Sequence, residues 1–198
     1  MMNIANLLTF SRIFLAVVFF ILMQLSGIWP VILAGFFFVI ATLTDYYDGY
    51  FAKKYNQTSD FGKIMDPIAD KFLILTAFFV FVKMGLVMGW MFVLIFLRET
   101  ILTGYRLAAV TKGHILAAEK AGKLKTAFQM ATVLVILLFV FLKRLDLFAP
   151  WDATSLQTFL DFGNMTILVL MTVVLGLTLY SGALYLWNNR GVFFQIKT

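Results

Sequence analysis

Long apolar stretches alternate with short polar connections along the whole chain, and each stretch is long enough to cross a bilayer as a helix. A membrane-spanning helix needs about 20 predominantly apolar residues. Six stretches meet this requirement, and a polar, proline-containing connection, 143–161, separates the last two. They are Ile4–Leu25, Val31–Tyr55, Gly62–Lys83, Trp90–Thr111, Glu119–Leu142 and Phe162–Asn188. The pattern predicts an all-α membrane protein with six transmembrane helices that form one domain, residues 1–198.

The composition supports an integral membrane protein and excludes several other classes. Hydrophobic residues make up 62% of the chain and charged residues 13%, whereas soluble domains contain about 25% charged residues. The chain has no cysteine, so it forms no disulfide and offers no thiolate to a metal. The net charge of +6 is typical of cytoplasmic loops that face anionic lipid. Nothing in the sequence resembles a module that binds nucleic acid.

The distribution of basic residues predicts the orientation in the membrane. The connections after the second and fourth stretches and the C-terminal end are rich in lysine and arginine, and the opposite connections are poor in them. Basic residues concentrate in cytoplasmic loops. We therefore expect a multi-pass protein of the cell's inner, cytoplasmic membrane, with both termini and the connection after the second stretch in the cytoplasm.

Four aspartates lie at the ends of two apolar stretches, next to the predicted cytoplasmic connection. Asp45 and Asp48 are three residues apart and Asp66 and Asp70 are four apart, so on helices each pair shares one face. A carboxylate at membrane depth costs about 2.5–3.5 kcal/mol on insertion scales. Ordinary ion pairs are an alternative, but the nearby cations are too few to pair with every carboxylate. Oxygen ligands at this density predict a site for Mg2+ or Mn2+, with room for two ions.

The spacing of these aspartates forms part of a longer motif. It reads Asp-x2-Asp-Gly-x2-Ala, and after a gap Gly-x3-Asp-x3-Asp. This motif resembles the signature of the CDP-alcohol phosphotransferases, in which an arginine follows the alanine. Here Lys53 stands at that position, and lysine keeps the charge but lacks the planar fork of arginine. Pro67 follows Asp66 directly, and we expect it in the first turn of the third helix or at a kink.

Two further regions extend the resemblance over nearly the whole chain. The opening residues 6–12 follow the pattern Asn-x2-Thr-x2-Arg, which is similar to the start of these enzymes. Arg98, Glu99, Arg106 and the run Gly122-Lys-Leu-Lys-Thr126 are similar to the branch of the family that makes phosphatidylglycerol phosphate. The pair Arg98–Glu99 is alternatively a structural ion pair inside the bundle. Arg12 is expected either to reach the cytoplasmic interface or to face the site.

The resemblance implies a reaction and a set of substrates. In this branch CDP-diacylglycerol donates its phosphatidyl group to sn-glycerol 3-phosphate, and CMP is released. The family further implies Mg2+ or Mn2+, with two ions the expected number, contact with membrane lipid and a homodimer.

The resemblance also assigns roles by motif position, and Asp70 is implied to be the catalytic general base as well as a metal ligand. The implied metal ligands are Asp45, Asp48, Asp66 and Asp70. The implied CDP-binding residues are Asn6, Thr9, Gly49, Ala52, Lys53 and Gly62. The implied residues that bind the acceptor's phosphate are Arg106, Lys123 and Lys125, for which binding of anionic lipid or a purely topological role is the alternative.

Two other functions stay open from the sequence. The same chemistry could use another acceptor, namely inositol phosphate, serine or phosphatidylglycerol, although Arg106, Lys123 and Lys125 favour a phosphorylated one over serine. A transporter of divalent cations or protons would also use an acidic cluster inside the membrane. Transporters usually repeat such a site in both halves, whereas here the four aspartates lie in one predicted hairpin.

Overall fold

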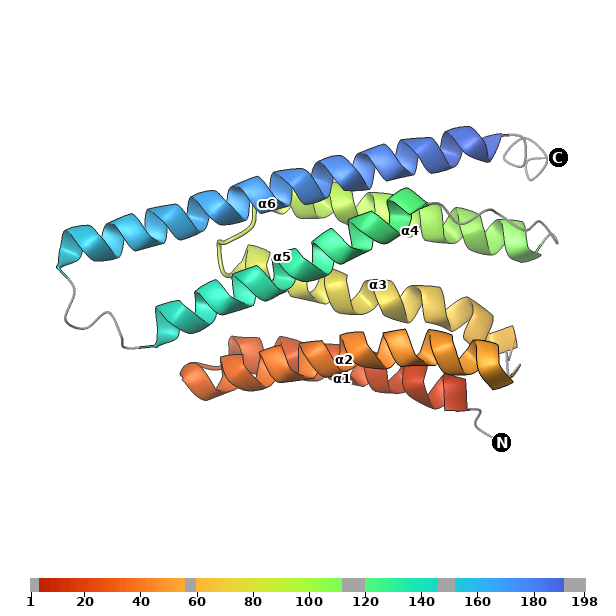
Figure 1. Ribbon diagram of the computed structural model, residues 1–198, viewed down its shortest axis with the longest axis horizontal. Helices are drawn as coiled ribbons and strands as arrows, with labels where there is room; N and C mark the ends of the chain where they lie inside the picture. The colour runs from red at the N-terminus through yellow and green to blue at the C-terminus, as the bar shows by residue number, and fades with distance from the viewer. Residues whose placement is uncertain (1–3, 56–59, 112–119, 146–151, 191–198) are drawn as a thin grey trace.

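The computed structural model describes the backbone of residues 4–55, 60–111, 120–145 and 152–190 (Figure 1). Side chains are described for residues 10–44, 68, 69, 71–109, 122–145 and 152–190. Within these ranges the regular structure is helical, and no strand is present. The helices are α1 (Ile4–Gln24), α2 (Ile28–Tyr55), α3 (Asp60–Lys83), α4 (Gly89–Thr111), α5 (Lys120–Arg144) and α6 (Ala153–Asn188).

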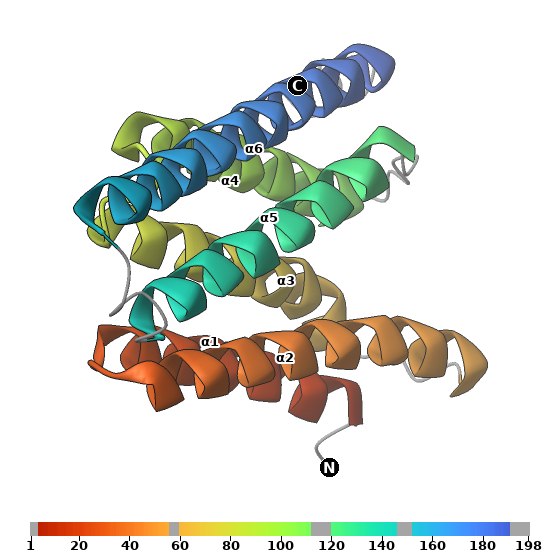
Figure 2. The same ribbon diagram turned by 60° about the vertical axis from the view of Figure 1, so that its left-hand side comes forward.

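The six helices pack as three layers of two. Figure 2 shows α1 and α2 on one side, α3 and α5 in the middle, and α4 and α6 on the other side. The contacts between helices agree, because α3 touches α1 and α4, and α5 touches α2 and α6. Since α2 and α3 lie diagonally to each other, they touch only sparsely, and α1 packs against both. The motif of the four aspartates therefore joins an outer layer to the middle layer.

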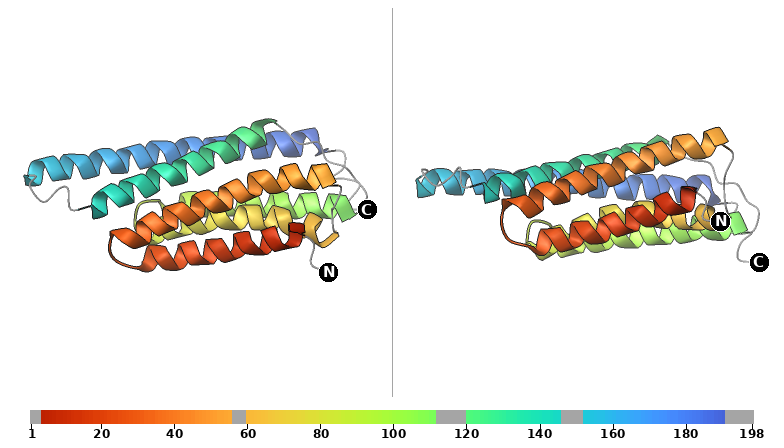
Figure 3. Two further views of the ribbon diagram at one scale, coloured as in Figure 1. Left: turned by 60° about the horizontal axis from the view of Figure 1, so that its bottom comes forward. Right: turned by 90° about the horizontal axis from the view of Figure 1, so that it is seen from below.

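The bundle has two distinct ends. α1 begins, α2 ends, α3 begins and α6 ends at the same end, which we call the hairpin end (Figures 1 and 3). The turns between α1 and α2 and between α3 and α4 lie at the opposite end, which we call the far end. Consecutive helices run in opposite directions along the bundle, so α1 begins and α6 ends at the same end.

Both turns at the far end depend on a glycine. Gly27 has a φ of 95° and Gly85 a φ of 73°, a region that is open to glycine but costly for other residues. Pro30 is the third residue of α2, where its missing N–H is harmless because the first turn has no partner for it. The second helix therefore begins at Ile28, three residues before the predicted start at Val31.

The sixth helix is longer than predicted. It begins at Ala153 rather than Phe162, so the prediction that residues 153–161 are part of a connection is wrong. Asp152 caps this helix, accepting hydrogen bonds from the amide of Ser155 at 3.3 Å and from its hydroxyl at 2.5 Å. These bonds lower the pKa of Asp152. Hydropathy detects only the apolar part of a helix, whereas a polar turn with a good cap is helical without being apolar.

The third helix also differs from prediction at its start. It begins at Asp60, so Pro67 is its eighth residue, and the expectation of a first-turn proline is wrong. Proline has no N–H to donate to the carbonyl four residues earlier. The helical backbone nevertheless continues through this position.

Buried apolar side chains concentrate in the half of the bundle next to the far end. Phe19 of α1, Phe38 of α2, Phe78 of α3, Ile95 of α4 and Ile136 of α5 belong to one core, and none is more than 1% exposed. In the other half, the described interior carries buried polar and charged side chains beside a few apolar ones such as Leu102 and Ala109. Among the described residues, the buried polar groups therefore lie mainly on the side of this core that is nearer the hairpin end.

Apolar side chains also cover the outside of the bundle. Phe14, Trp29, Phe162 and Tyr180 are all at least 65% exposed, each on a different part of the surface. Within the described residues, two stretches, Gly122–Arg144 and Ala153–Asn188, are long and apolar enough to cross a membrane. Shorter apolar stretches occupy Phe10–Gln24 and Ile28–Thr44. An apolar exterior on a bundle that already has an apolar core is typical of a protein surrounded by lipid.

The close approach of α5 and α6 gives a test of the packing. A Cβ added at Gly163 would lie 2.0 Å from Cε2 of Phe139, whose ring packs at 5.6 Å from that of Phe159. We expect Gly163→Ala to lower the free energy of unfolding by about 1–3 kcal/mol, the usual cost of overpacking, measured by thermal unfolding in detergent. Gly176→Ala on the same helix is the control, because no heavy atom lies within 4 Å of its Cβ position. Equal destabilisation by both changes would contradict the packing.

Candidate active site

The four aspartates of the motif lie on continuous helix on both sides of the hairpin. Asp45 and Asp48 are in the C-terminal part of α2, and Asp66 and Asp70 are in the N-terminal half of α3. The prediction that each pair belongs to a helix is therefore confirmed, and each pair shares one helix face. Their side chains lie outside the described residues, so their metal-binding role stays a prediction.

The residues implied to bind CDP belong to three helices that meet at the hairpin end. Asn6 and Thr9 are in the first turns of α1, Gly62 is in the first turn of α3, and the others, Gly49, Ala52 and Lys53, are near the end of α2. The start of α1, the end of α2 and the start of α3 lie at one end of the bundle (Figure 3). The side chains of all six residues are outside the described part of the chain.

The described side chains offer a metal no site of their own. No group of three or more His, Asp or Glu residues that could hold an ion occurs among them. The donor set that fits Mg2+ or Mn2+ is the set of four aspartates, since both ions prefer carboxylate oxygens.

A buried ion-pair cluster links α3, α4 and α5 in the same half of the bundle. Glu99 of α4 is 2% exposed. Its Oε2 accepts a hydrogen bond from Nζ of Lys71 on α3 at 2.8 Å. Its Oε1 accepts from Nη1 of Arg98 at 3.1 Å and also from Nζ of Lys125 on α5. We call these four residues the Glu99 cluster.

Arg98 connects the Glu99 cluster to a further helix, α6. Nη2 of Arg98 donates to Oγ of Ser181 on α6 at 2.8 Å. Gly182 makes room for this arginine, because a Cβ there would lie 2.9 Å from its Nε. The alternative that Arg98 and Glu99 form an ion pair inside the bundle is thereby confirmed.

Other buried polar side chains continue this layer. Gln129, one turn after Lys125 on α5, approaches Oγ1 of Thr178 on α6 at 3.5 Å. Arg12 of α1 is 2% exposed, which contradicts the alternative that it reaches out to the membrane interface. Buried polar side chains therefore lie on α1, α4, α5 and α6 in this half, and several of them bond across helices.

The three cations implied to bind the acceptor's phosphate have different surroundings. Lys125 is buried and paired with Glu99, whereas Lys123 is exposed, because residues two apart on a helix point about 200° from each other. The guanidinium of Arg106 lies 5.5 Å from the ring centre of Tyr185, a cation–π contact between α4 and α6. The structure thus brings Lys125 into the Glu99 cluster and does not bring Lys123 there. Phosphate binding by these residues stays a prediction.

Sequence reasoning missed Lys71 and Ser181 as partners in this region. One signal was available, because a glutamate in the middle of an apolar stretch must find cations on neighbouring helices. Lys71 directly follows Asp70 and lies inside the third predicted helix rather than at one of its ends, so it was a candidate partner for this glutamate. A serine in an apolar helix carries no comparable signal, since its hydroxyl can bond to its own backbone.

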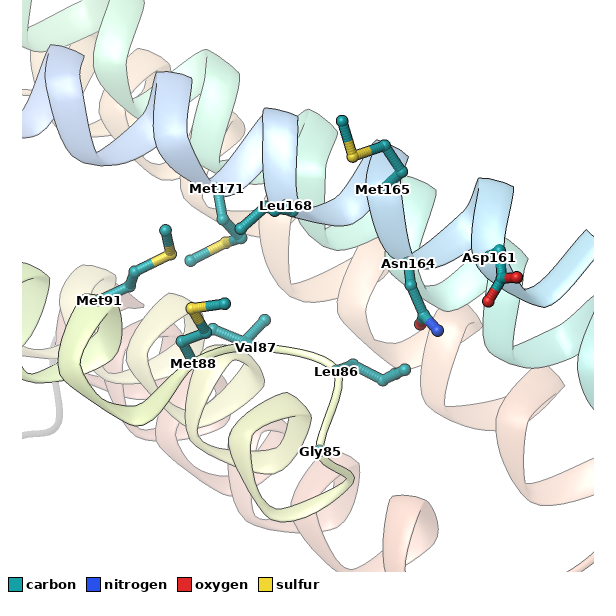
Figure 4. Close-up of a pocket in the computed structure, with 10 residues that line it drawn as sticks. All are labelled: Gly85, Leu86, Val87, Met88, Met91, Asp161, Asn164, Met165, Leu168 and Met171. Carbon is teal, nitrogen blue, oxygen red and sulfur yellow. The ribbon is translucent and has the colours of Figure 1, made fainter.

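A separate cavity lies near the far end, away from the hairpin end. Its volume is about 400 Å³, and it opens between the start of α4 with its preceding turn and the N-terminal half of α6 (Figure 4). Met88, Met91 and Met171 line one part of it, and Asp161 and Asn164 line another. None of the residues implied for substrate or metal binding contributes to this cavity.

Comparison with known proteins identifies a family and several relatives that this chain resembles in sequence. The sequence model of the family described as CDP-alcohol phosphatidyltransferase matches residues 2–187. The chain is 39% identical over 150 residues to a CDP-diacylglycerol–glycerol-3-phosphate 3-phosphatidyltransferase of Bacillus subtilis, which covers 70% of this chain and 78% of that protein.

Proteins from two other bacteria are also similar to this chain. A protein of the same name from Rickettsia typhi is 35% identical over 139 residues, covering 70% of this chain and 78% of the relative. A probable phosphatidylglycerophosphate synthase from Mycobacterium tuberculosis is 36% identical over 134 residues, covering 66% and 64% of the two chains. The motif, the family match over nearly the full length and these relatives together show that the chain belongs to the CDP-alcohol phosphatidyltransferase family.

Proposed function

We propose that this protein transfers the phosphatidyl group of CDP-diacylglycerol to sn-glycerol 3-phosphate, giving phosphatidylglycerol phosphate and CMP. The observation that carries the proposal is the complete set of motif aspartates on two helices that meet at one end of the bundle. Relatives whose names state this reaction support the choice of acceptor.

All six helices cross the cytoplasmic membrane, with both termini and the hairpin end on the cytoplasmic side. The shortest helix, α1, has 21 residues and is about 31 Å long at 1.5 Å per residue, close to the roughly 30 Å of a hydrocarbon core. The exposed apolar side chains and the lysines near the hairpin support this orientation. A lipid donor then enters from the side, and the water-soluble acceptor enters from the cytoplasm.

The carboxylates of Asp45, Asp48, Asp66 and Asp70 hold Mg2+ or Mn2+, with two ions the expected number. When bound, these ions neutralise the diphosphate of the donor and stabilise CMP as it leaves. Two carboxylates from each of two helices match the oxygen-rich coordination that both ions prefer. Their concentration at one hairpin would otherwise leave several negative charges close together.

Asp70 is the general base of the transfer. It accepts the proton of the acceptor's C1 hydroxyl. The hydroxyl oxygen forms a bond to the phosphorus of the phosphatidyl group, and the bond from that phosphorus to the bridging oxygen breaks. CMP leaves with the bridging oxygen, so one ester bond replaces one anhydride bond.

The remaining motif residues orient the two substrates. Asn6, Thr9, Gly49, Ala52, Lys53 and Gly62 surround the CDP group. Arg106, Lys123 and Lys125 supply positive charge for the acceptor's phosphate. The active form is a homodimer, in keeping with the resemblance.

The reaction has a direct test. Purified protein in detergent is expected to release CMP from CDP-diacylglycerol only when glycerol 3-phosphate and Mg2+ or Mn2+ are both present. A parallel panel with serine, inositol phosphate and phosphatidylglycerol checks the acceptor. If CMP is released faster with one of these alcohols, that alcohol replaces glycerol 3-phosphate as the proposed acceptor. If no acceptor gives CMP release, the proposed function is overturned.

A further inference from the structure

The carboxylate of Glu99 joins both helices of the middle layer. Its two oxygens bond to different helices, Oε2 to Lys71 of α3 and Oε1 to Lys125 of α5. Arg98, the preceding residue of α4, fixes the backbone of this turn against Ser181 of α6. The buried carboxylate thus bonds to side chains of α3, α4 and α5, and Arg98 extends the cluster to α6.

The two lysines occupy informative positions in the sequence. Lys71 directly follows Asp70 on α3, so the bond to Glu99 restrains the rotation and height of that helix at Asp70. Lys125 belongs to the run 122–126 of α5, which also contains Lys123. Glu99 therefore links the helix that carries the proposed base with the helix that carries two of the proposed phosphate-binding cations.

We propose that Glu99 is a positioning residue that holds α5 against α3 at the spacing required by an acceptor with a hydroxyl at one end and a phosphate at the other. This inference rests on the proposed function. Glycerol 3-phosphate must meet Asp70 on α3 with its hydroxyl and cations on α5 with its phosphate, so a shift between these helices misplaces one of its ends. Glu99 itself touches no reacting atom.

The donor shares α3 with the acceptor, but none of the residues proposed for the donor lies on α5. The residues proposed for CDP lie on α1, on α2 and at Gly62 in the first turn of α3. In the described part of these three helices, the residue that bonds to Glu99 is Lys71 of α3. A loss of the Glu99 carboxylate is therefore expected to impair use of the acceptor more than use of the donor. A purely stabilising role would not distinguish between the two substrates.

Glu99→Gln is the principal test, since glutamine keeps the shape but removes the charge that both lysines share. We expect the KM for glycerol 3-phosphate to rise at least about tenfold, because hydrogen bonds to charged groups are lost, while the KM for CDP-diacylglycerol stays within about twofold. Glu99→Asp keeps the charge on a shorter side chain and is expected to give an intermediate KM for glycerol 3-phosphate.

Gln129→Leu is the matched control. Gln129 is buried on α5 one turn from Lys125, but its described bond goes to α6 rather than to α3. The variant is expected to change the thermal stability while leaving both KM values within about twofold.

A binding measurement separates this inference from the proposed function. Glycerol 3-phosphate is expected to raise the Tm of the wild-type protein in detergent, as any ligand of the folded state does, and to raise that of Glu99→Gln less. If Glu99→Gln does not fold, Glu99→Asp carries the same measurements. Unchanged KM and Tm responses to glycerol 3-phosphate in the variant, or equal rises in both KM values, would overturn the positioning role. Absence of CMP release by the wild type would overturn the proposed function instead.

Discussion

Replacement of Asp70 by asparagine is expected to lower the rate of CMP release by about a hundredfold to ten-thousandfold, the range that a positioned general base contributes. Asparagine has nearly the same size and shape as aspartate, so the helix around this position is expected to form as before. Its amide accepts no proton from the attacking hydroxyl and brings no negative charge to a metal. The rate is measured as CMP released from CDP-diacylglycerol at saturating glycerol 3-phosphate and Mg2+.

An aspartate at the other end of the bundle provides the control. Asp161 on α6 is exposed and accepts a hydrogen bond from Gln157 at 3.0 Å. Asp161→Asn makes the same chemical change away from the hairpin end, and its activity is expected to stay within about twofold of the wild type. The Tm in detergent shows whether both variants are folded. Full activity of Asp70→Asn would remove this residue from the role of base.

Removal of divalent cations is expected to have an effect of similar size. Dialysis against EDTA should lower CMP release at least about a hundredfold, because the charge of the diphosphate and of departing CMP is then left unbalanced. Addition of Mg2+ or Mn2+ in excess of the chelator should restore the activity. Activity that survives thorough chelation would exclude a metal-dependent transfer.

Binding of Mn2+ tests the same site without turnover. Electron paramagnetic resonance of the EDTA-treated protein titrated with Mn2+ should show bound ion in the wild type and weaker binding in Asp66→Asn. Asp161→Asn again serves as the control and should bind as the wild type does. Equal Mn2+ binding by Asp66→Asn would remove Asp66 from the set of ligands while leaving the other aspartates to be tested.

The helices were largely predictable from the sequence, and the errors in the prediction have local causes. Each predicted apolar stretch corresponds to a helix, and most ends agree within a few residues. The error at α6 arose because the polar residues after Asp152 are helical through capping, which hydropathy does not register. The first-turn expectation for Pro67 was wrong because the helix extends back to Asp60 and its backbone continues through the proline.

The candidate site was predictable only where its signal is local in sequence. The aspartate motif extends over one hairpin, so spacing alone identified it, and the structure confirms that its members lie on two helices. Lys125 was predicted as a phosphate-binding residue, but its bond to Glu99 was not foreseen. That bond joins residues 26 positions apart in the chain, and no periodic pattern records such a pairing.

The sequence by itself determined the number of helices, their apolar character and the grouping of four carboxylates at one turn, because each of these depends on neighbours within a few helical turns. Only the tertiary structure decided which helices share a layer, and that α3 and α5 both bond to one glutamate of α4. The physical reason is that a buried charge is stabilised by whichever opposite charge the packing brings within hydrogen-bonding distance. Packing depends on the shapes of whole helix faces, which the order of residues along one helix does not reveal.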